Sequence, residues 1–218
     1  MHIEPGFISP VKVLLANATA TGVITYYAKA ILKKPFEIVK ILLAAIFFSV
    51  FMQIFHLSVG PSELHFIGGM AIYMTLGFIP TLLGFALGLL LQGLLFEPVD
   101  LPHLAVNSLS LIMPLITVHY TVGKKFFENA SKNVLTWKTI LKFDAIFYSG
   151  VTAMVGFWLL LGDTVTPFAA WLAFASSYLA VVAIEPFVTY SAIWLLKRYE
   201  TSTAVEKCFS VKNLKLTA

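Results

Sequence analysis

Apolar residues along the chain gather in runs long enough to cross a lipid bilayer. Five such runs lie near 11–31, 37–57, 104–122, 140–161 and 167–195, and a longer one extends over 65–96. The hydrocarbon core of a bilayer is about 30 Å thick, and about 20 helical residues cross it. The first five runs therefore predict membrane-spanning helices.

The long run at 65–96 predicts two helices. A single helix of that length would extend about 48 Å, which is too long for the bilayer without severe tilt. The segment Gly77-Phe78-Ile79-Pro80 offers a break, because proline lacks the N–H that would continue the helix. We expect short helices over 65–77 and 80–96, and about seven transmembrane helices in all.

Basic residues orient these spans, because short cytoplasmic loops collect Lys and Arg. With the amino terminus outside, Lys12 is the only one of the 15 basic residues that falls on the outer side. Merging 65–96 into one helix would instead place the lysines of 123–139 outside. The pattern favours seven spans, an outer amino terminus and a cytoplasmic carboxyl terminus.

Composition agrees with the membrane class. Hydrophobic residues make up 59% of the chain, charged residues 12%, and the mean hydropathy is +0.87, unlike a soluble globular protein. We predict an all-α integral membrane protein, multi-pass in the cytoplasmic (inner) membrane, with a membrane domain over 1–196 and a short cytoplasmic tail over 197–218. The net charge of +4 reflects orientation and gives no reason to expect nucleic acid as a partner.

Metal-ligating groups are predicted on the outer side. The first residues lack the features of a cleaved signal, and His2 is too large to favour removal of Met1, so we expect a free amine at Met1. That amine, the backbone nitrogen of His2 and its ring nitrogen can wrap one metal and leave one position of a square plane. Such a plane suits nickel(II), copper(II) or cobalt(II), whereas zinc prefers a tetrahedron. The imidazole of His65, at the same level, is a candidate for the open position.

Other cofactor chemistry is disfavoured. No two histidines are predicted to face each other at mid-membrane, as paired axial ligands of a haem would. Cys208 is the only cysteine, which excludes an intramolecular disulfide and a thiolate metal cage. The chain also lacks a Gly-x-x-x-x-Gly-Lys-[Ser/Thr] phosphate loop. We therefore expect neither a prosthetic group nor an enzymatic activity.

Four sequence features are similar to those of one transporter family. They are Met1-His2-Ile3-Glu4-Pro5-Gly6-Phe7-Ile8-Ser9-Pro10, then Pro61-Ser62-Glu63-Leu64-His65-Phe66-Ile67-Gly68-Gly69, then Gln92-Gly93-Leu94-Leu95-Phe96 with Asn107 eleven residues after Phe96, and Glu185-Pro186 in the last span. In order and spacing the chain resembles the CbiM/NikM family, the substrate-binding membrane components of energy-coupling factor (ECF) transporters for cobalt and nickel. The chain departs from the family pattern at Glu4-Pro5, Ser62-Glu63-Leu64 and Ser110, which puts metal selectivity in question.

This resemblance implies a function and a site. Met1, through its amine, His2, through its backbone and ring nitrogens, and the His65 ring would bind Co²⁺ or Ni²⁺ as a transported ligand, with Asn107 as a supporting hydrogen-bonding residue. The partners would be a transmembrane coupling subunit, two cytoplasmic ATPase subunits and, in some systems, a small accessory membrane protein. Cobalt taken up in this way could feed cobalamin biosynthesis.

Several residues admit two interpretations. Asn107 either supports the metal site or joins two helices, and His103 is expected in a solvated loop rather than at a cation-attracting mouth. Glu185 is a functional candidate because ionisable groups inside a bilayer are costly, but a hydrogen-bonded carboxyl beside Pro186 explains it equally well. Asp144 is expected to pair with a nearby lysine or to reach the interface.

The first span carries the small-residue pairs Ala16/Ala20 and Ala18/Gly22, which fit packing within the bundle or contact with a coupling subunit. Two alternatives to a transport subunit stay open. One is a haem-anchoring subunit of a membrane enzyme, and the other is a membrane scaffold with a degenerate metal site.

Overall fold

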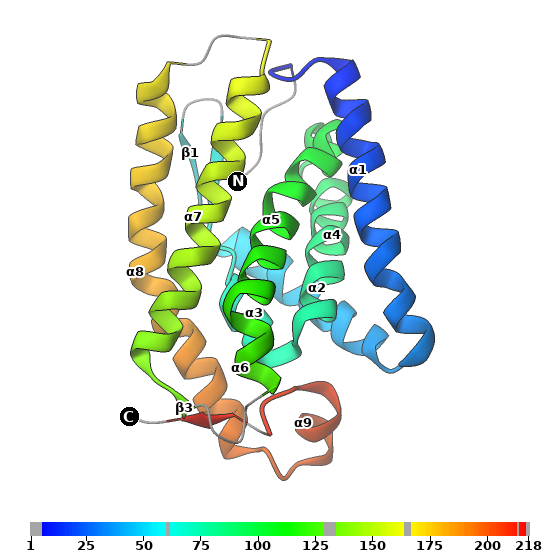
Figure 1. Cartoon of the computed structure of the whole chain (residues 1–218), viewed down its shortest axis with the longest axis vertical. Helices are drawn as coiled ribbons and strands as arrows, with labels where there is room; N and C mark the ends of the chain where they lie inside the picture. Colours follow the sequence, from blue (N-terminus) through cyan, green and yellow to red (C-terminus); the bar gives the residue numbers. More distant parts are fainter. Residues whose placement is uncertain (1–5, 60–61, 129–133, 164–166, 213, 217–218) are drawn as a thin grey trace.

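The computed structural model describes every residue except 1–5, 60–61, 129–133, 164–166, 213 and 217–218. Its long helices run side by side along the longest axis of the molecule (Figure 1). They are α1 (Pro10–Ala28), α2 (Glu37–Ile54), α4 (Phe78–Leu95), α5 (Leu104–Val118), α7 (Trp137–Leu161) and α8 (Phe168–Arg198). The start of α1 and the end of α7 lie at one end of the bundle, and α9 (Thr203–Cys208) lies at the other.

Shorter elements join the long helices. The helical ones are η1 (Lys29–Lys33), α3 (Gly69–Leu76), η2 (Pro98–His103), the π-helical turn η3 (His119–Gly123) and α6 (Lys124–Glu128). The strands are β1 (His56–Val59) and β2 (Ser62–His65), which pair antiparallel, and β3 (Val134–Leu135) and β4 (Lys215–Leu216), which pair parallel.

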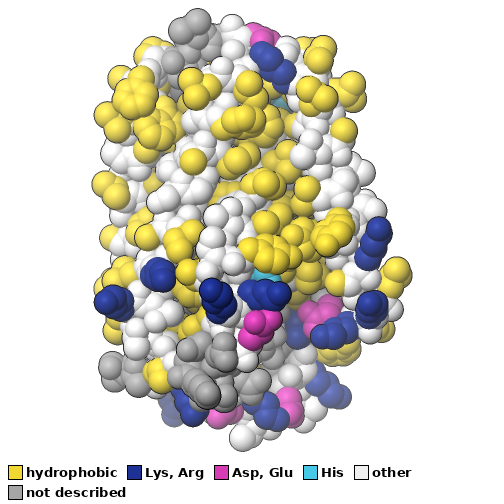
Figure 2. Space-filling view, in the orientation of Figure 1, with side chains coloured by type: hydrophobic (Ala, Val, Ile, Leu, Met, Phe, Trp, Pro, Cys, Tyr) yellow, Lys and Arg dark blue, Asp and Glu magenta, His cyan; other side chains and the backbone are white. Residues whose placement is uncertain are grey.

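The outer surface of the bundle is apolar, as in a membrane protein. Five helical stretches of the described chain are long and apolar enough to cross a membrane: Glu37–Ile54, Phe78–Leu95, Pro98–Glu128, Trp137–Leu161 and Phe168–Arg198. Large apolar side chains are exposed on these helices; Leu160 and Leu179, for example, are 88% and 70% exposed. Soluble proteins rarely expose large continuous apolar surfaces. Figure 2 shows apolar side chains over the middle of one face and lysines and arginines near the end that carries α9.

The expected break in the 65–96 run is present, but at a different residue. Gly77 separates α3 from α4 with φ of +94°, and Pro80 lies in the first turn of α4. Proline fits there because the first N–H groups of a helix have no partner within it. The first segment differs from the expected helix over 65–77: it begins as strand β2, and α3, at about 12 Å, is too short to span a bilayer alone.

Small residues let α2 and α4 approach closely. A Cβ atom added at Gly84 would lie 2.4 Å from the Cβ of Ala44, and one at Gly88 would lie 2.5 Å from the Phe48 ring. Phe48 and Phe85 meet between these helices, and both are fully buried. Close backbone approach supplies the dispersion contacts that hold helices together in lipid, where the hydrophobic effect contributes little. The β1–β2 hairpin lies against α2 and α8.

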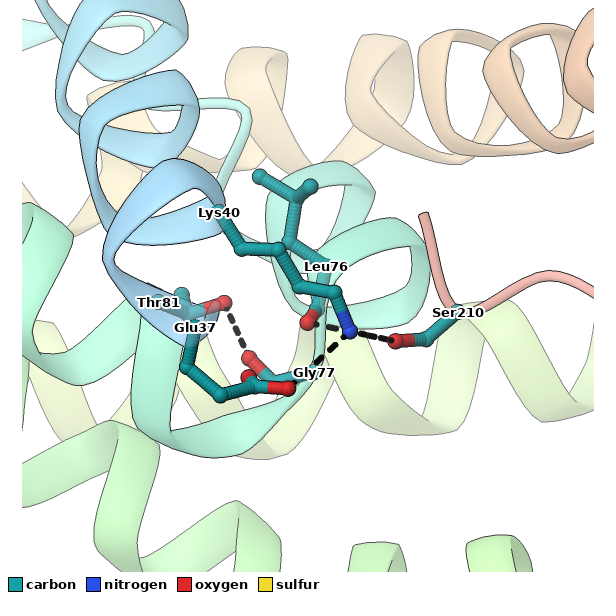
Figure 3. Close-up of polar contacts among 6 residues, drawn as sticks. All are labelled: Glu37, Lys40, Leu76, Gly77, Thr81 and Ser210. Atoms are coloured by element: carbon teal, nitrogen blue, oxygen red, sulfur yellow. Dashed lines mark hydrogen bonds and ion pairs between the residues drawn. The ribbon is translucent and has the colours of Figure 1, made fainter. Parts of the chain in front are cut away.

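The segment after α9 packs against the α3–α4 turn. Ser210 donates its backbone N–H to Thr75 O at 2.7 Å, and Lys40 Nζ lies 3.3 Å from Ser210 Oγ and 3.2 Å from Glu37 Oε1 (Figure 3). Val211 is buried. The last carbonyl groups of a helix have no partner within it. At the end of α3, Ser210, near the carboxyl terminus of the chain, supplies the missing hydrogen-bond donors.

The two small-residue pairs of α1 have different surroundings. Ala16 and Ala20 are 3% and 4% exposed and pack inside the bundle, whereas Ala18 and Gly22 are exposed. A Cβ atom at Gly22 would meet nothing within 4 Å. Packing inside the bundle therefore accounts for the first pair only.

Candidate metal centre

His65 ends a short hairpin that enters the helix bundle. In the register of β1 and β2, His56 pairs with His65 and Ser58 with Glu63. The His56 side chain is exposed, but His65 is 1% exposed and its ring centroid lies 6.0 Å from that of His56. Gly60-Pro61 is a turn signal, and His56-Leu57-Ser58-Val59 alternates polar and apolar residues. The segment Ser62-Glu63-Leu64-His65 does not alternate, and our assignment of His65 to a helix missed the second strand.

Both ring nitrogens of His65 face oxygen atoms. Nδ1 lies 3.3 Å from the backbone O of Met52, near the end of α2, and Nε2 lies 3.2 Å from Glu63 Oε2. Such contacts to a backbone carbonyl are the usual way of fixing the orientation and tautomer of a metal-binding histidine. With Nδ1–H donated to the Met52 carbonyl, Nε2 is the nitrogen that can bind a metal. In the metal-free protein its contact with the Glu63 carboxylate needs a proton on Nε2, which a metal would displace.

Glu63 is part of this site, although the sequence placed it in an outer loop. It precedes His65 by two positions in β2, and alternate residues of a strand share a face. Its hydrogen bond with the His65 ring lowers the pKa of the Glu63 carboxyl, which outweighs the opposite effect of partial burial. A carboxylate charge therefore lies beside the nitrogen that is available to a cation.

The other predicted site residues lie in different places. Asn107 is buried in the first turn of α5, and Met1 and His2 lie outside the described residues. His103, expected in a solvated loop, is 3% exposed at the end of η2. That expectation was wrong because η2 and α5 fold the apparent loop onto the bundle.

The described part of the chain does not hold a complete metal site of its own. No three His, Cys, Asp or Glu side chains within it come together as ligands could. His65 Nε2 and the Glu63 carboxylate provide one nitrogen and one oxygen donor at a buried position. A four-coordinate site at His65 therefore requires further ligands.

The start of α1 is fastened to the end of α7. Lys12 Nζ donates to Asp163 Oδ1 at 2.5 Å and to Leu161 O at 2.6 Å, and Asp163 donates its backbone N–H to Phe7 O. Lys12, the single basic residue predicted outside, thus has a local carboxylate partner. The contact lowers the pKa of the exposed Asp163 carboxyl.

Two acidic residues within the helices are fully buried. Glu185 of α8 accepts a hydrogen bond from the Met70 N–H at 2.8 Å and another from the Tyr148 hydroxyl. Asp144 of α7 was expected to reach a lysine or the interface, but neither of its carboxyl oxygens has a hydrogen-bond partner in the described structure. The expectation failed because α7 turns Asp144 towards the bundle interior.

Comparison with known proteins identifies the family. The family model described as "Cobalt uptake substrate-specific transmembrane region", CbiM, matches residues 2–203. The chain belongs to this family. This CbiM protein is accordingly a membrane protein of metal-ion uptake, and the match spans the hairpin, the buried acids and the helix bundle described above.

Two solved structures share the fold. The chain is 21% identical to a protein described as a transition metal transporter, with a TM-score of 0.72 over 95% of this chain and 97% of the other. A truncated transition metal transporter is 20% identical, with a TM-score of 0.72 over 91% and 99% of the two chains. At this identity the likeness shows the CbiM fold alone. A comparison with curated proteins gives no match.

Proposed function

We propose that this CbiM protein is the substrate-binding component of an ECF-type importer and captures Co²⁺ or Ni²⁺ on the outer side of the cytoplasmic membrane. The ligands are the Met1 amine, the backbone and ring nitrogens of His2, and the His65 ring. The family match supports metal uptake. The observation that carries the site is the His65 ring, buried and held through Nδ1 by the Met52 carbonyl.

The position of Phe7 and Lys12 supports an amino-terminal contribution to the site. Residues 7–12 are fixed against the end of α7, and Ile8 is buried. The segment that leads into α1 therefore has a defined place at the end of the bundle where α1 starts and α7 ends (Figure 1). Lysines and arginines gather near the opposite end, which carries α9 (Figure 2), and this agrees with an outer location for the start of α1.

Uptake against a gradient needs partners in this proposal. A transmembrane coupling subunit and two cytoplasmic ATPase subunits supply the energy, and a small accessory membrane protein completes some assemblies. The exposed Ala18/Gly22 face of α1 is the surface on which we place the coupling subunit, because small residues permit close helix approach. The chain itself contributes binding, with no catalysis.

The test is metal binding by purified full-length chain with an untouched amino terminus. We expect stoichiometric Ni²⁺ or Co²⁺ binding that is lost when one residue is added before Met1 and in His65→Ala. One residue added after Ala218 serves as the matched control. Equal binding in the amino-extended chain would contradict a site built on the Met1 amine. A Soret band in the purified protein would instead favour the haem-anchoring alternative.

A further inference from the structure

Helix α3 begins beside His65 without a capping side chain of its own. The residue at its N-cap is Gly68, and all eight residues of the helix are buried. The first N–H groups of a helix have no partner within it, and inside a membrane protein water cannot replace that partner. An acceptor must therefore come from another part of the chain.

Glu185 supplies this acceptor from α8, 115 positions away in the sequence. Its Oε1 accepts the Met70 N–H at 2.8 Å, and its Oε2 accepts the Tyr148 hydroxyl of α7. The partial positive charge at a helix N-terminus favours a carboxylate there. Each oxygen thus has a donor, and the carboxyl joins the start of α3 to both α7 and α8.

The link from this carboxyl to His65 is short and stiff. Between His65 and α3, the Phe66 N–H donates to Phe55 O at 3.1 Å and Ile67 is 1% exposed. Gly68 then turns the chain with φ of +63°. Because the Phe66 N–H is bonded to Phe55 O and the Ile67 side chain is buried, a shift of the first turn of α3 would be transmitted to the His65 ring and its contacts with Met52 and Glu63.

We propose that Glu185 is a positioning residue for metal binding, holding His65 in the orientation in which Nε2 meets the metal. Glu185 acts through the first turn of α3 and does not touch the metal itself. The inference rests on the proposed function. It assigns a role to a carboxyl that lies too deep in the helices to be an ordinary surface group.

The test compares Glu185→Leu, Glu185→Gln and Thr189→Val in the full-length chain. Thr189 is the matched control, because it lies one turn further along α8, is equally buried, and its hydroxyl has no partner among the described residues. The readouts are the Ni²⁺ dissociation constant and the visible absorption band of the bound ion, with monodisperse elution as the check on folding.

We expect Glu185→Leu to weaken Ni²⁺ binding by about 10- to 100-fold, as loss of a group that orients a metal ligand does, and to shift the absorption band. Glu185→Gln, which keeps an oxygen for the Met70 N–H, should restore most of the affinity, and Thr189→Val should match the unmodified chain. Unchanged affinity and spectrum in folded Glu185→Leu would overturn the inference.

If Glu185→Leu does not fold, Tyr148→Phe decides the question, because it removes only the hydroxyl that holds Oε2. A weakened affinity with a shifted band supports positioning by Glu185, and an unchanged pair of values overturns it. Failure of the proposed function is recognised separately. In that case the unmodified chain binds no Ni²⁺, or His65→Ala binds it as well as the unmodified chain does.

Discussion

Gly68 is the residue at which the His65 strand becomes helix α3, and its replacement by alanine is a stringent test of the site. Its φ of +63° is a left-handed conformation that alanine adopts at a cost of about 1–2 kcal/mol. A Cβ atom at this position would also lie 2.2 Å from Cδ2 of Phe51. Relieving such a clash costs about 1–3 kcal/mol. We expect Gly68→Ala to lower the free energy of unfolding by about 2–5 kcal/mol.

Gly68→Ala should also weaken metal binding, because Gly68 lies between the proposed ligand His65 and helix α3, and strain at this position would move His65. We expect the Ni²⁺ dissociation constant to rise about tenfold or more. Unfolding is measured in mixed micelles of increasing SDS by tryptophan fluorescence, and metal binding by titration. Gly22→Ala is the control, because Gly22 is exposed within α1 and a Cβ atom there meets nothing within 4 Å. It should stabilise the chain by up to about 1 kcal/mol.

A double-mutant cycle separates the two contributions. In a Phe51→Ala background the clash disappears and only the backbone strain remains, so Gly68→Ala should then cost about 1–2 kcal/mol. The reasoning is refuted if Gly68→Ala is as stable as the unmodified chain. It is also refuted if the cost is the same with and without the Phe51 ring.

Three further predictions concern charge, packing and the docking of a partner. Glu63→Gln removes the carboxylate charge beside His65 Nε2. It should weaken binding of a divalent ion by about tenfold and change the free energy of unfolding by no more than about 1 kcal/mol. Equal or tighter binding in a metal titration would contradict this prediction. Ala20→Leu enlarges a buried residue and should lower stability by about 1–3 kcal/mol. Gly22→Leu, on the exposed face, should leave folding and metal binding intact and reduce co-purification of the proposed coupling subunit. An unchanged yield of that subunit would remove this face as the proposed docking surface.

The long helices could be predicted because one property, the length of an apolar run, determines them. The run at 37–57 corresponds to α2 at Glu37–Ile54, and the run at 140–161 to α7 at Trp137–Leu161. The hairpin was missed for a physical reason. A four-residue strand is too short to show a clear alternation of polar and apolar residues beside a long apolar run. His65, the last residue of β2, was therefore assigned to the helix that follows it.

Within the proposed site, the sequence pointed to His65 as a ligand, but not to the groups that hold its ring. The Met52 carbonyl is a backbone group, whose partners depend on tertiary structure rather than on residue type. Glu185 was recognised as costly in a membrane, but its role depends on α3 beginning against α8, a contact between residues 115 positions apart. Pairings at such separation leave no local pattern in a single sequence.

The stability of α3 follows from contacts at its two ends. An isolated helix of this length is not stable, because forming its first turn is unfavourable and few hydrogen bonds compensate. Here Glu185 accepts the Met70 N–H at the start, and Ser210 donates its backbone N–H to Thr75 O at the end. The polar groups that a short buried helix would leave unsatisfied are therefore matched by residues from α8 and from the segment after α9. Because both partners come late in the chain, the ends of α3, and with them the segment that follows His65, depend on contacts with α8 and with the carboxyl-terminal segment.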